Sequence, residues 1–219
     1  MTEQTPEQRA ARVDVVLSCA PAVPILVIEH LDDAVPLARA LVDAGLPVLE
    51  VTLRTDVALA AIRRIRDEVP GVCVGAGTVL DGTHLAAIEA AGAAFAISPG
   101  ATQALYAAAA ASSLPWIPGI ATASELMRGL EHGYRRFKFF PAQAAGGVAA
   151  LRAFAGPFPQ VRFCPTGGID PDNAPAYLRL PNVITVGGSW MVPADALAAG
   201  DWDRIAALAS RAAGLRSSG

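Results

Sequence analysis

The sequence has 219 residues, of which 53% are hydrophobic and 17% charged, and its net charge is −3. This length and composition suit one domain, 1–219, with a large buried core, and they exclude extensive disorder. The Lys and Arg residues are scattered and form no basic surface, so we expect no nucleic-acid partner.

The N-terminus and the cysteines indicate where the protein works. Residues 1–12 are polar where a signal peptide needs an apolar segment, and no apolar stretch is long enough to cross a bilayer. Cys19, Cys73 and Cys164 are odd in number and form no C-x-x-C pair, which favours reduced thiols. We therefore expect a soluble, cytoplasmic protein with no membrane partner.

Short apolar runs alternate with helical patterns along the chain. The runs begin at Ile25, Val48, Val72, Ala94, Trp116, Arg136, Val161 and Val183. Helices are predicted over 33–44, 56–68, 83–91, 102–111 and 124–132, with a further helix over 1–20 and a last one over 201–215. The expected N-caps are Asp32 or Asp33, Thr83, Thr102, and Thr122 or Ser124.

Eight strands that alternate with helices predict an α/β protein with a parallel sheet. Eight strand–helix repeats account for the whole chain after the first helix, which favours a (β/α)8 TIM barrel with an extra N-terminal helix. The alternative is an open doubly wound sheet, which often has a glycine-rich loop after its first strand. Residues 25–34 contain no glycine, so the barrel is the better interpretation.

The second strand places polar side chains where a barrel interior is normally apolar. Alternation puts Leu49 and Val51 toward the helices and puts Glu50, Thr52 and Arg54 toward the barrel axis. A Glu50–Arg54 ion pair that only fills the barrel is one alternative. Buried ion pairs are poor stabilisers, so a functional role for these residues is favoured.

The sixth strand points Lys138 and Phe140 into the barrel, and Phe137 and Phe139 away from it. An ammonium group is poorly solvated in such a place, and the neutral amine is the form that attacks a carbonyl. Lys138 is also the single lysine among 17 basic residues. Because arginine cannot form an imine, a lone lysine here predicts Schiff-base chemistry.

Two pairs of glycines follow the last two strands. Gly167 and Gly168 follow the seventh strand, and Gly187 and Gly188 precede Ser189 after the eighth. Loops after these strands of a barrel often bind phosphate through backbone N–H groups. The three histidines lie far apart in the sequence and form no ligand motif, so no metal site is expected and His30 is assigned no role.

The sequence resembles the family of 2-keto-3-deoxy-6-phosphogluconate (KDPG) and 4-hydroxy-2-oxoglutarate aldolases. The matching stretches are VLEVTLRT (48–55), VGAGTVL (74–80), FAISPG (95–100), PGIATASELMRGLEHG (118–133), FKFFPA (137–142), VRFCPTGGI (161–169) and VGGSWMVPADAL (186–197). The sequence departs from the resemblance at residues 29–30, Glu-His, where relatives often carry a basic residue.

The resemblance implies a role for individual residues. Lys138 resembles the Schiff-base lysine and Glu50 the general acid/base of the family. Arg54 and Thr78 resemble ligands of the substrate carboxylate, with Phe140 and Thr166 lining the pocket. The implied phosphate site consists of Gly167, Gly168, Gly188 and Ser189. The family is homotrimeric and needs no cofactor, so we expect the same here.

The predicted reaction is cleavage of a 2-keto acid phosphate. The resemblance implies that KDPG, an intermediate of the Entner–Doudoroff pathway, yields pyruvate and glyceraldehyde 3-phosphate, and that 4-hydroxy-2-oxoglutarate yields pyruvate and glyoxylate. A phosphosugar epimerase or isomerase and a non-catalytic phosphate-binding barrel are the alternatives. Neither alternative requires a buried lysine. The preference among KDPG, its C4 epimer and 4-hydroxy-2-oxoglutarate is not fixed by the sequence.

Overall fold

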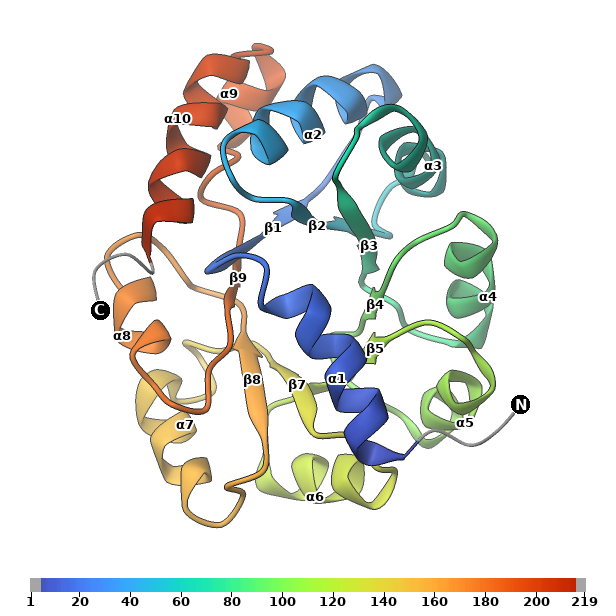
Figure 1. Ribbon diagram of the computed structural model, residues 1–219, viewed down its shortest axis with the longest axis vertical. Helices are drawn as coiled ribbons and strands as arrows, with labels where there is room; N and C mark the ends of the chain where they lie inside the picture. The colour runs from blue at the N-terminus through green and yellow to red at the C-terminus, as the bar shows by residue number, and fades with distance from the viewer. Residues whose placement is uncertain (1–4, 216–219) are drawn as a thin grey trace.

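The computed structural model describes residues 5–215, and its strands form a closed parallel barrel surrounded by helices (Figure 1). The strands are β1 (Ala22–Leu26), β2 (Val48–Thr52), β3 (Cys73–Gly77), β4 (Ala96–Ile97), β5 (Trp116–Ile117), β6 (Gly119–Ile120), β7 (Arg136–Phe139), β8 (Arg162–Pro165) and β9 (Val186–Gly188). One sheet has the order β5-β4-β3-β2-β1-β9 and a second has the order β6-β7-β8.

The two sheets join at both ends, which closes the barrel. Proline cannot donate a ladder hydrogen bond, so Pro118 divides one strand of the barrel into β5 and β6. These two short strands therefore occupy one position in the barrel. On the other side, the parallel bridges Phe163↔Val183 and Thr166↔Gly187 connect β8 to the segment that contains β9. The prediction of a (β/α)8 barrel is confirmed.

The outer helices follow the strands, as predicted. They are α2 (Ala34–Asp43, preceded by the 3-10 turn Leu31–Asp33), α3 (Ala58–Glu68), α4 (Gly82–Ala90), α5 (Gln103–Ala111), α6 (Ala123–Glu131), α7 (Gly147–Ala155), α8 (Ala174–Leu178), α9 (Ala194–Ala198) and α10 (Trp202–Ala213). Thr102 and Thr122 cap their helices as predicted. The expectation for Thr83 was wrong, because the Asp81 carboxylate accepts the His84 N–H, so the N-cap of α4 lies two residues earlier.

An extra helix, α1 (Pro6–Leu17), lies across the end of the barrel at which the strands begin (Figure 1). Residues 1–4 of the predicted first helix lie outside the described residues. Val13, Val16 and Leu17 of α1 pack into one cluster with the barrel-interior residues Val23 and Val48. The helix therefore closes this end of the barrel with apolar side chains and leaves the opposite end for a site.

The two faces of the strands separate as the alternation predicts. Leu49 and Val51 of β2 and Phe137 and Phe139 of β7 belong to the large cluster between the strands and the outer helices. The opposite faces of β2 and β7 carry Glu50 and Lys138 into the barrel. None of the helices described between residues 5 and 215 is both long and apolar enough to cross a membrane.

Candidate active site

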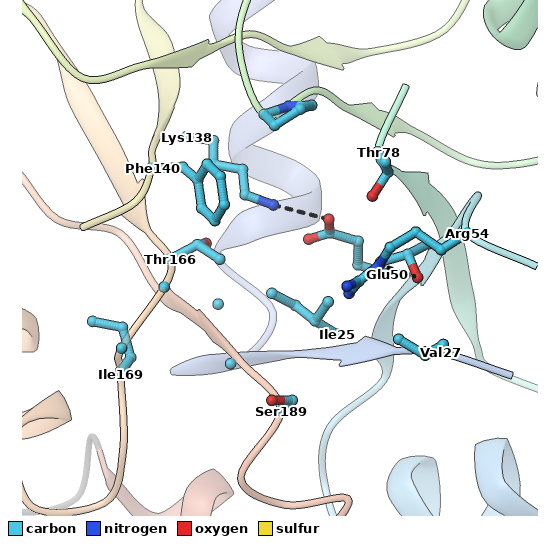
Figure 2. Close-up of a pocket in the computed structure, with 16 residues that line it drawn as sticks. Ile25, Val27, Glu50, Arg54, Thr78, Lys138, Phe140, Thr166, Ile169 and Ser189 are labelled. Atoms are coloured by element: carbon cyan, nitrogen blue, oxygen red, sulfur yellow. Dashed lines mark hydrogen bonds and ion pairs between the residues drawn. The ribbon is translucent and has the colours of Figure 1, made fainter. Parts of the chain in front are cut away.

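A cavity of about 550 Å³ lies at the end of the barrel where the strands finish. All ten residues that the sequence singled out line this cavity, namely Glu50, Arg54, Thr78, Lys138, Phe140, Thr166, Gly167, Gly168, Gly188 and Ser189. Figure 2 shows Lys138 and Phe140 on one side, with Glu50, Arg54 and Thr78 facing them. The structure therefore brings together residues from five segments of the sequence.

The centre of the cavity is an ion pair between Lys138 and Glu50. The Lys138 Nζ donates to the Glu50 Oε1 at 3.0 Å, and the two side chains are 7% and 2% exposed. β7 and β2 lie on opposite sides of the barrel, with β1, β9 and β8 between them in one direction. The pair thus spans the barrel axis, where each charge depends on the other because little water reaches it.

Gly77 at the end of β3 makes room for the Glu50 carboxylate. A Cβ atom added at Gly77 would lie 2.0 Å from the Glu50 Oε1, which is an impossible contact. β2 and β3 are neighbours in register, with Thr52 opposite Gly77. Because Gly77 has no side chain, the Glu50 carboxylate can occupy this space beside the amine.

Arg54 brings a second positive charge to the cavity. Its Nε donates to the Thr52 Oγ1 at 3.3 Å, and the Thr52 hydroxyl in turn donates to the Leu26 carbonyl at 2.9 Å. Within residues 5–215 its guanidinium forms no ion pair. The alternative of a Glu50–Arg54 pair is therefore wrong, and Arg54 has free donors for an anion.

Thr78 has a backbone conformation that the sequence did not reveal. Its φ is 61°, in the left-handed region that β-branched residues rarely adopt. Such a conformation costs on the order of 1–3 kcal/mol and is concentrated at functional sites. It places Thr78 in the wall of the cavity directly after β3, where the side chain faces the Lys138–Glu50 pair (Figure 2).

Thr166 presents a buried hydroxyl that has no partner. Among the described residues its Oγ1 makes no hydrogen bond, although the residue is only 4% exposed. Gly187 leaves space for this hydroxyl, since a Cβ at Gly187 would lie 2.3 Å from it. A buried polar atom without a partner costs free energy unless a ligand supplies the hydrogen bond.

The glycine pairs form one wall of the same cavity. Gly167 and Gly168 have φ values of 100° and 73°, which L side chains rarely adopt, and Ser189 is exposed at the adjoining loop after β9. Phe140 lies beside Gly167 in the adjoining wall, with its ring centroid 5.5 Å from the Lys138 Nζ. The lining thus combines two cations, one carboxylate, four hydroxyl side chains and exposed backbone.

Several groups stay outside this chemistry. Burial raises the pKa of Cys164 to about 12, so the thiol remains neutral beneath Lys138, as expected for a core residue. His30 lines a separate neighbouring cavity of about 470 Å³ together with Glu29 and Asp33. Within residues 5–215, no group of three or more His, Cys, Asp or Glu side chains is arranged to hold a metal ion.

Some lining residues were not predicted from the sequence. They are Ile25, Val27, Pro99 and Ile169. Pro99 follows β4 directly, so its place at the end of a predicted strand was the available signal. Ile25 and Val27 gave no such signal because apolar residues are expected on every face of a barrel strand.

Comparison with known proteins identifies the family. The model of the KDPG and KHG aldolase family matches residues 13–208. The chain belongs to this family of aldolases. The KHG/KDPG aldolase of Escherichia coli strain K12 is 59% identical over 197 residues, covering 90% of this chain and 92% of that protein.

Two solved structures of aldolases show how similar the barrels are. One is the KDPG aldolase of Legionella pneumophila with pyruvate captured as a covalent carbinolamine, with a TM-score of 0.90, 50% identity, and coverage of 91% of this chain and 97% of that one. The other is the Zymomonas mobilis aldolase with 3-phosphoglycerate, with a TM-score of 0.88, 51% identity, and coverage of 93% and 95%. The aldolase activity and the barrel are thus common to these relatives.

Proposed function

We propose that this aldolase cleaves KDPG to pyruvate and glyceraldehyde 3-phosphate through an imine on Lys138. The observation that carries the proposal is the buried Lys138–Glu50 pair at 3.0 Å in the wall of a cavity. It places an amine beside Glu50, the one carboxylate among the described residues that line the cavity, which can accept and return its proton. The covalent carbinolamine of pyruvate in the Legionella relative supports the same chemistry.

Glu50 performs the proton transfers of the reaction. It takes a proton from the Lys138 ammonium, and the neutral amine attacks the C2 ketone of the substrate. Protonated Glu50 then gives its proton to the departing C2 hydroxyl, which leaves as water and creates an iminium. The Glu50 carboxylate next takes the proton of the C4 hydroxyl as the C3–C4 bond breaks.

The iminium holds the electron pair of the broken bond as an enamine. Glyceraldehyde 3-phosphate leaves, C3 of the enamine takes a proton, and water hydrolyses the imine to release pyruvate and Lys138. Phe140 lies 5.5 Å from the Lys138 Nζ and keeps bulk water from one side of the intermediate. No step requires a metal, so activity should survive exhaustive treatment with EDTA.

The two charged ends of KDPG match the two ends of the cavity. Arg54, with the hydroxyls of Thr78 and Thr166, supplies donors for the carboxylate beside the ketone. Gly167, Gly168, Gly188 and Ser189 supply backbone and hydroxyl donors for the phosphate. We propose that 4-hydroxy-2-oxoglutarate is a second substrate, since the relative from Escherichia coli is named for both activities.

The active form that we propose is a cytoplasmic homotrimer without a cofactor. Three free cysteines within the described residues are consistent with a reducing compartment. Light scattering coupled to size-exclusion chromatography would give the mass of the assembly. A mass of one or two chains at working concentration would contradict the trimer without touching the imine chemistry.

Trapping with borohydride tests the proposed function directly. Pyruvate and borohydride should inactivate the enzyme and add one reduced pyruvate to the peptide that contains Lys138. The assignment is unambiguous because Lys138 is the single lysine in the sequence. Labelling only at the N-terminal amine, or no labelling, would refute the imine and favour an epimerase, an isomerase or a binding protein.

A further inference from the structure

Two carbonyl groups in the loop after β8 accept hydrogen bonds from residues that do not line the cavity. The Gln143 N–H donates to the Gly167 carbonyl at 3.0 Å, and the Asn173 Nδ2 donates to the Gly168 carbonyl at 2.9 Å. Gly168 and Ile169 line the cavity, whereas Gln143 and Asn173 do not. The acceptors of this loop are thus engaged on the side away from the cavity.

Because peptide groups are planar, these two hydrogen bonds also orient the N–H groups of the next two residues. In a planar trans peptide the C=O of one residue and the N–H of the next point in opposite directions. Holding the Gly167 carbonyl behind the loop therefore directs the Gly168 N–H toward the cavity. Holding the Gly168 carbonyl does the same for the Ile169 N–H, and within the described residues neither N–H has a protein acceptor.

Asn173 is itself fixed by the turn that it belongs to. Its side-chain Oδ1 accepts the Asp170 backbone N–H at 3.1 Å, and its backbone N–H donates to the Asp170 Oδ1 at 2.9 Å. Both polar atoms of the amide are thereby used, one on Asp170 and one on Gly168. The side chain cannot rotate without breaking two hydrogen bonds.

We propose that Asn173 is a positioning residue for the phosphate of the substrate. It touches no substrate itself, and it acts by aiming the Ile169 N–H, together with that of Gly168, at the anion. Two preoriented N–H groups bind an anion without having to reorganise when it arrives. The inference rests on the proposed function for the identity of the phosphorylated substrate, but the preoriented donors are a property of the loop.

The test is Asn173→Ala, measured with two substrates and with inorganic phosphate. We expect KM for KDPG, and Kd for inorganic phosphate from NMR titration, to rise roughly 3- to 10-fold, as for the loss of one well-oriented hydrogen bond. kcat for KDPG and KM for 4-hydroxy-2-oxoglutarate should not change, because the imine chemistry and a substrate without phosphate do not use this loop. Unchanged KM and Kd, or equal rises of KM on both substrates, would overturn the proposal.

The chain offers a matched control in Asn182. Its Nδ2 donates to the Leu151 carbonyl at 2.8 Å. Like the Asn173 bond, this bond joins an asparagine amide to a backbone carbonyl, but it is buried and lies outside the cavity. Asn182→Ala should lower the melting temperature and leave phosphate affinity unchanged. The same loss of phosphate affinity in both variants would mean general loosening of the barrel, and would overturn the proposal.

A second variant covers the case in which Asn173→Ala does not fold. Asn173→Ser keeps an oxygen that can accept the Asp170 N–H, but its hydroxyl falls short of the Gly168 carbonyl, so the same loss of phosphate affinity is expected. The phosphate titration also separates the two proposals. Failure of pyruvate to label Lys138 in the unaltered enzyme would refute the imine chemistry, while the titration would still decide the role of Asn173.

Discussion

The two ends of the barrel each hold an ion pair to a cation on β7, and the pairs differ in what they do. Arg136 and Lys138 lie two residues apart on the same face of the strand. Arg136 binds the Asp14 carboxylate of α1 with two hydrogen bonds, at 2.6 and 2.7 Å. Lys138 binds Glu50 with one hydrogen bond at 3.0 Å beside a cavity.

The difference shows how position on one strand separates stability from chemistry. At the closed end a planar guanidinium engages both oxygens of the carboxylate and fastens α1 to the barrel. At the open end a primary amine faces the cavity and can lose its proton, which a guanidinium cannot. The same kind of pair is thus structural at one end, while we propose that it is catalytic at the other.

The largest expected effect comes from exchanging the cation at the open end. Lys138→Arg should keep the charge and the fold but lower kcat by roughly 10⁴-fold or more, because the nucleophile is lost. Pyruvate release coupled to lactate dehydrogenase measures the rate, and circular dichroism reports the fold. The matched control is Arg136→Lys, which should keep both kcat and KM. Retained activity in Lys138→Arg would refute the role of Lys138 as the nucleophile.

The next effect comes from the carboxylate at the open end. Glu50→Gln keeps the shape of the side chain but removes the proton acceptor, so kcat should fall by roughly 10²- to 10⁴-fold. Pyruvate binding, followed by fluorescence or calorimetry, should persist. A loss of less than tenfold would transfer the acid/base role to another group, and a water held by a neighbouring hydroxyl would be the next candidate.

A smaller effect is expected at the phosphate end of the cavity. Ser189→Ala removes one hydrogen bond to a charged group, worth about 1.5–3 kcal/mol, so kcat/KM for KDPG should fall roughly 10- to 100-fold. The same ratio for 4-hydroxy-2-oxoglutarate should be nearly unchanged, since that substrate has no phosphate. Equal losses on both substrates would show that the loop shapes the mouth of the barrel generally.

The smallest effect is expected at the closed end. Asp14→Asn removes a partly exposed pair, with side chains 16% and 36% exposed, and should lower the free energy of unfolding by about 1 kcal/mol or less. For a chain of this size that corresponds to a fall in Tm of about 2–4 °C at most, measured by thermal denaturation. kcat and KM should not change. A loss of activity here would mean that α1 transmits strain to the cavity.

Much of this arrangement was open to prediction from the sequence, because the signals are local. Alternation along a strand has a period of two, so it assigned Glu50 and Lys138 to the barrel interior and Leu49 and Phe137 to the helices, as the structure confirms. The single lysine pointed to amine chemistry without any coordinates. The eight alternating runs were sufficient to predict the barrel.

Some boundaries could not be read from local patterns. The first strand was expected from Ile25 but begins at Ala22, because pairing of Ala22 with Val186 extends the ladder toward α1. Thr83 resembled an N-cap, yet the preceding aspartate at position 81 takes that place. In both cases a tertiary partner or a competing neighbour outweighs the propensity of a single residue.

Only the tertiary structure decided which of the inward-facing groups meet. Glu50 and Lys138 are 88 residues apart, and their contact depends on closure of the barrel, which sets two strands opposite each other. The pairing of Asp14 with Arg136, across 122 residues, depends on how α1 crosses the barrel. The strained backbone of Thr78 is likewise fixed by surrounding packing. The sequence alone determined which side chains face inward, because that property is local, whereas distances across the barrel depend on register and closure of the whole sheet.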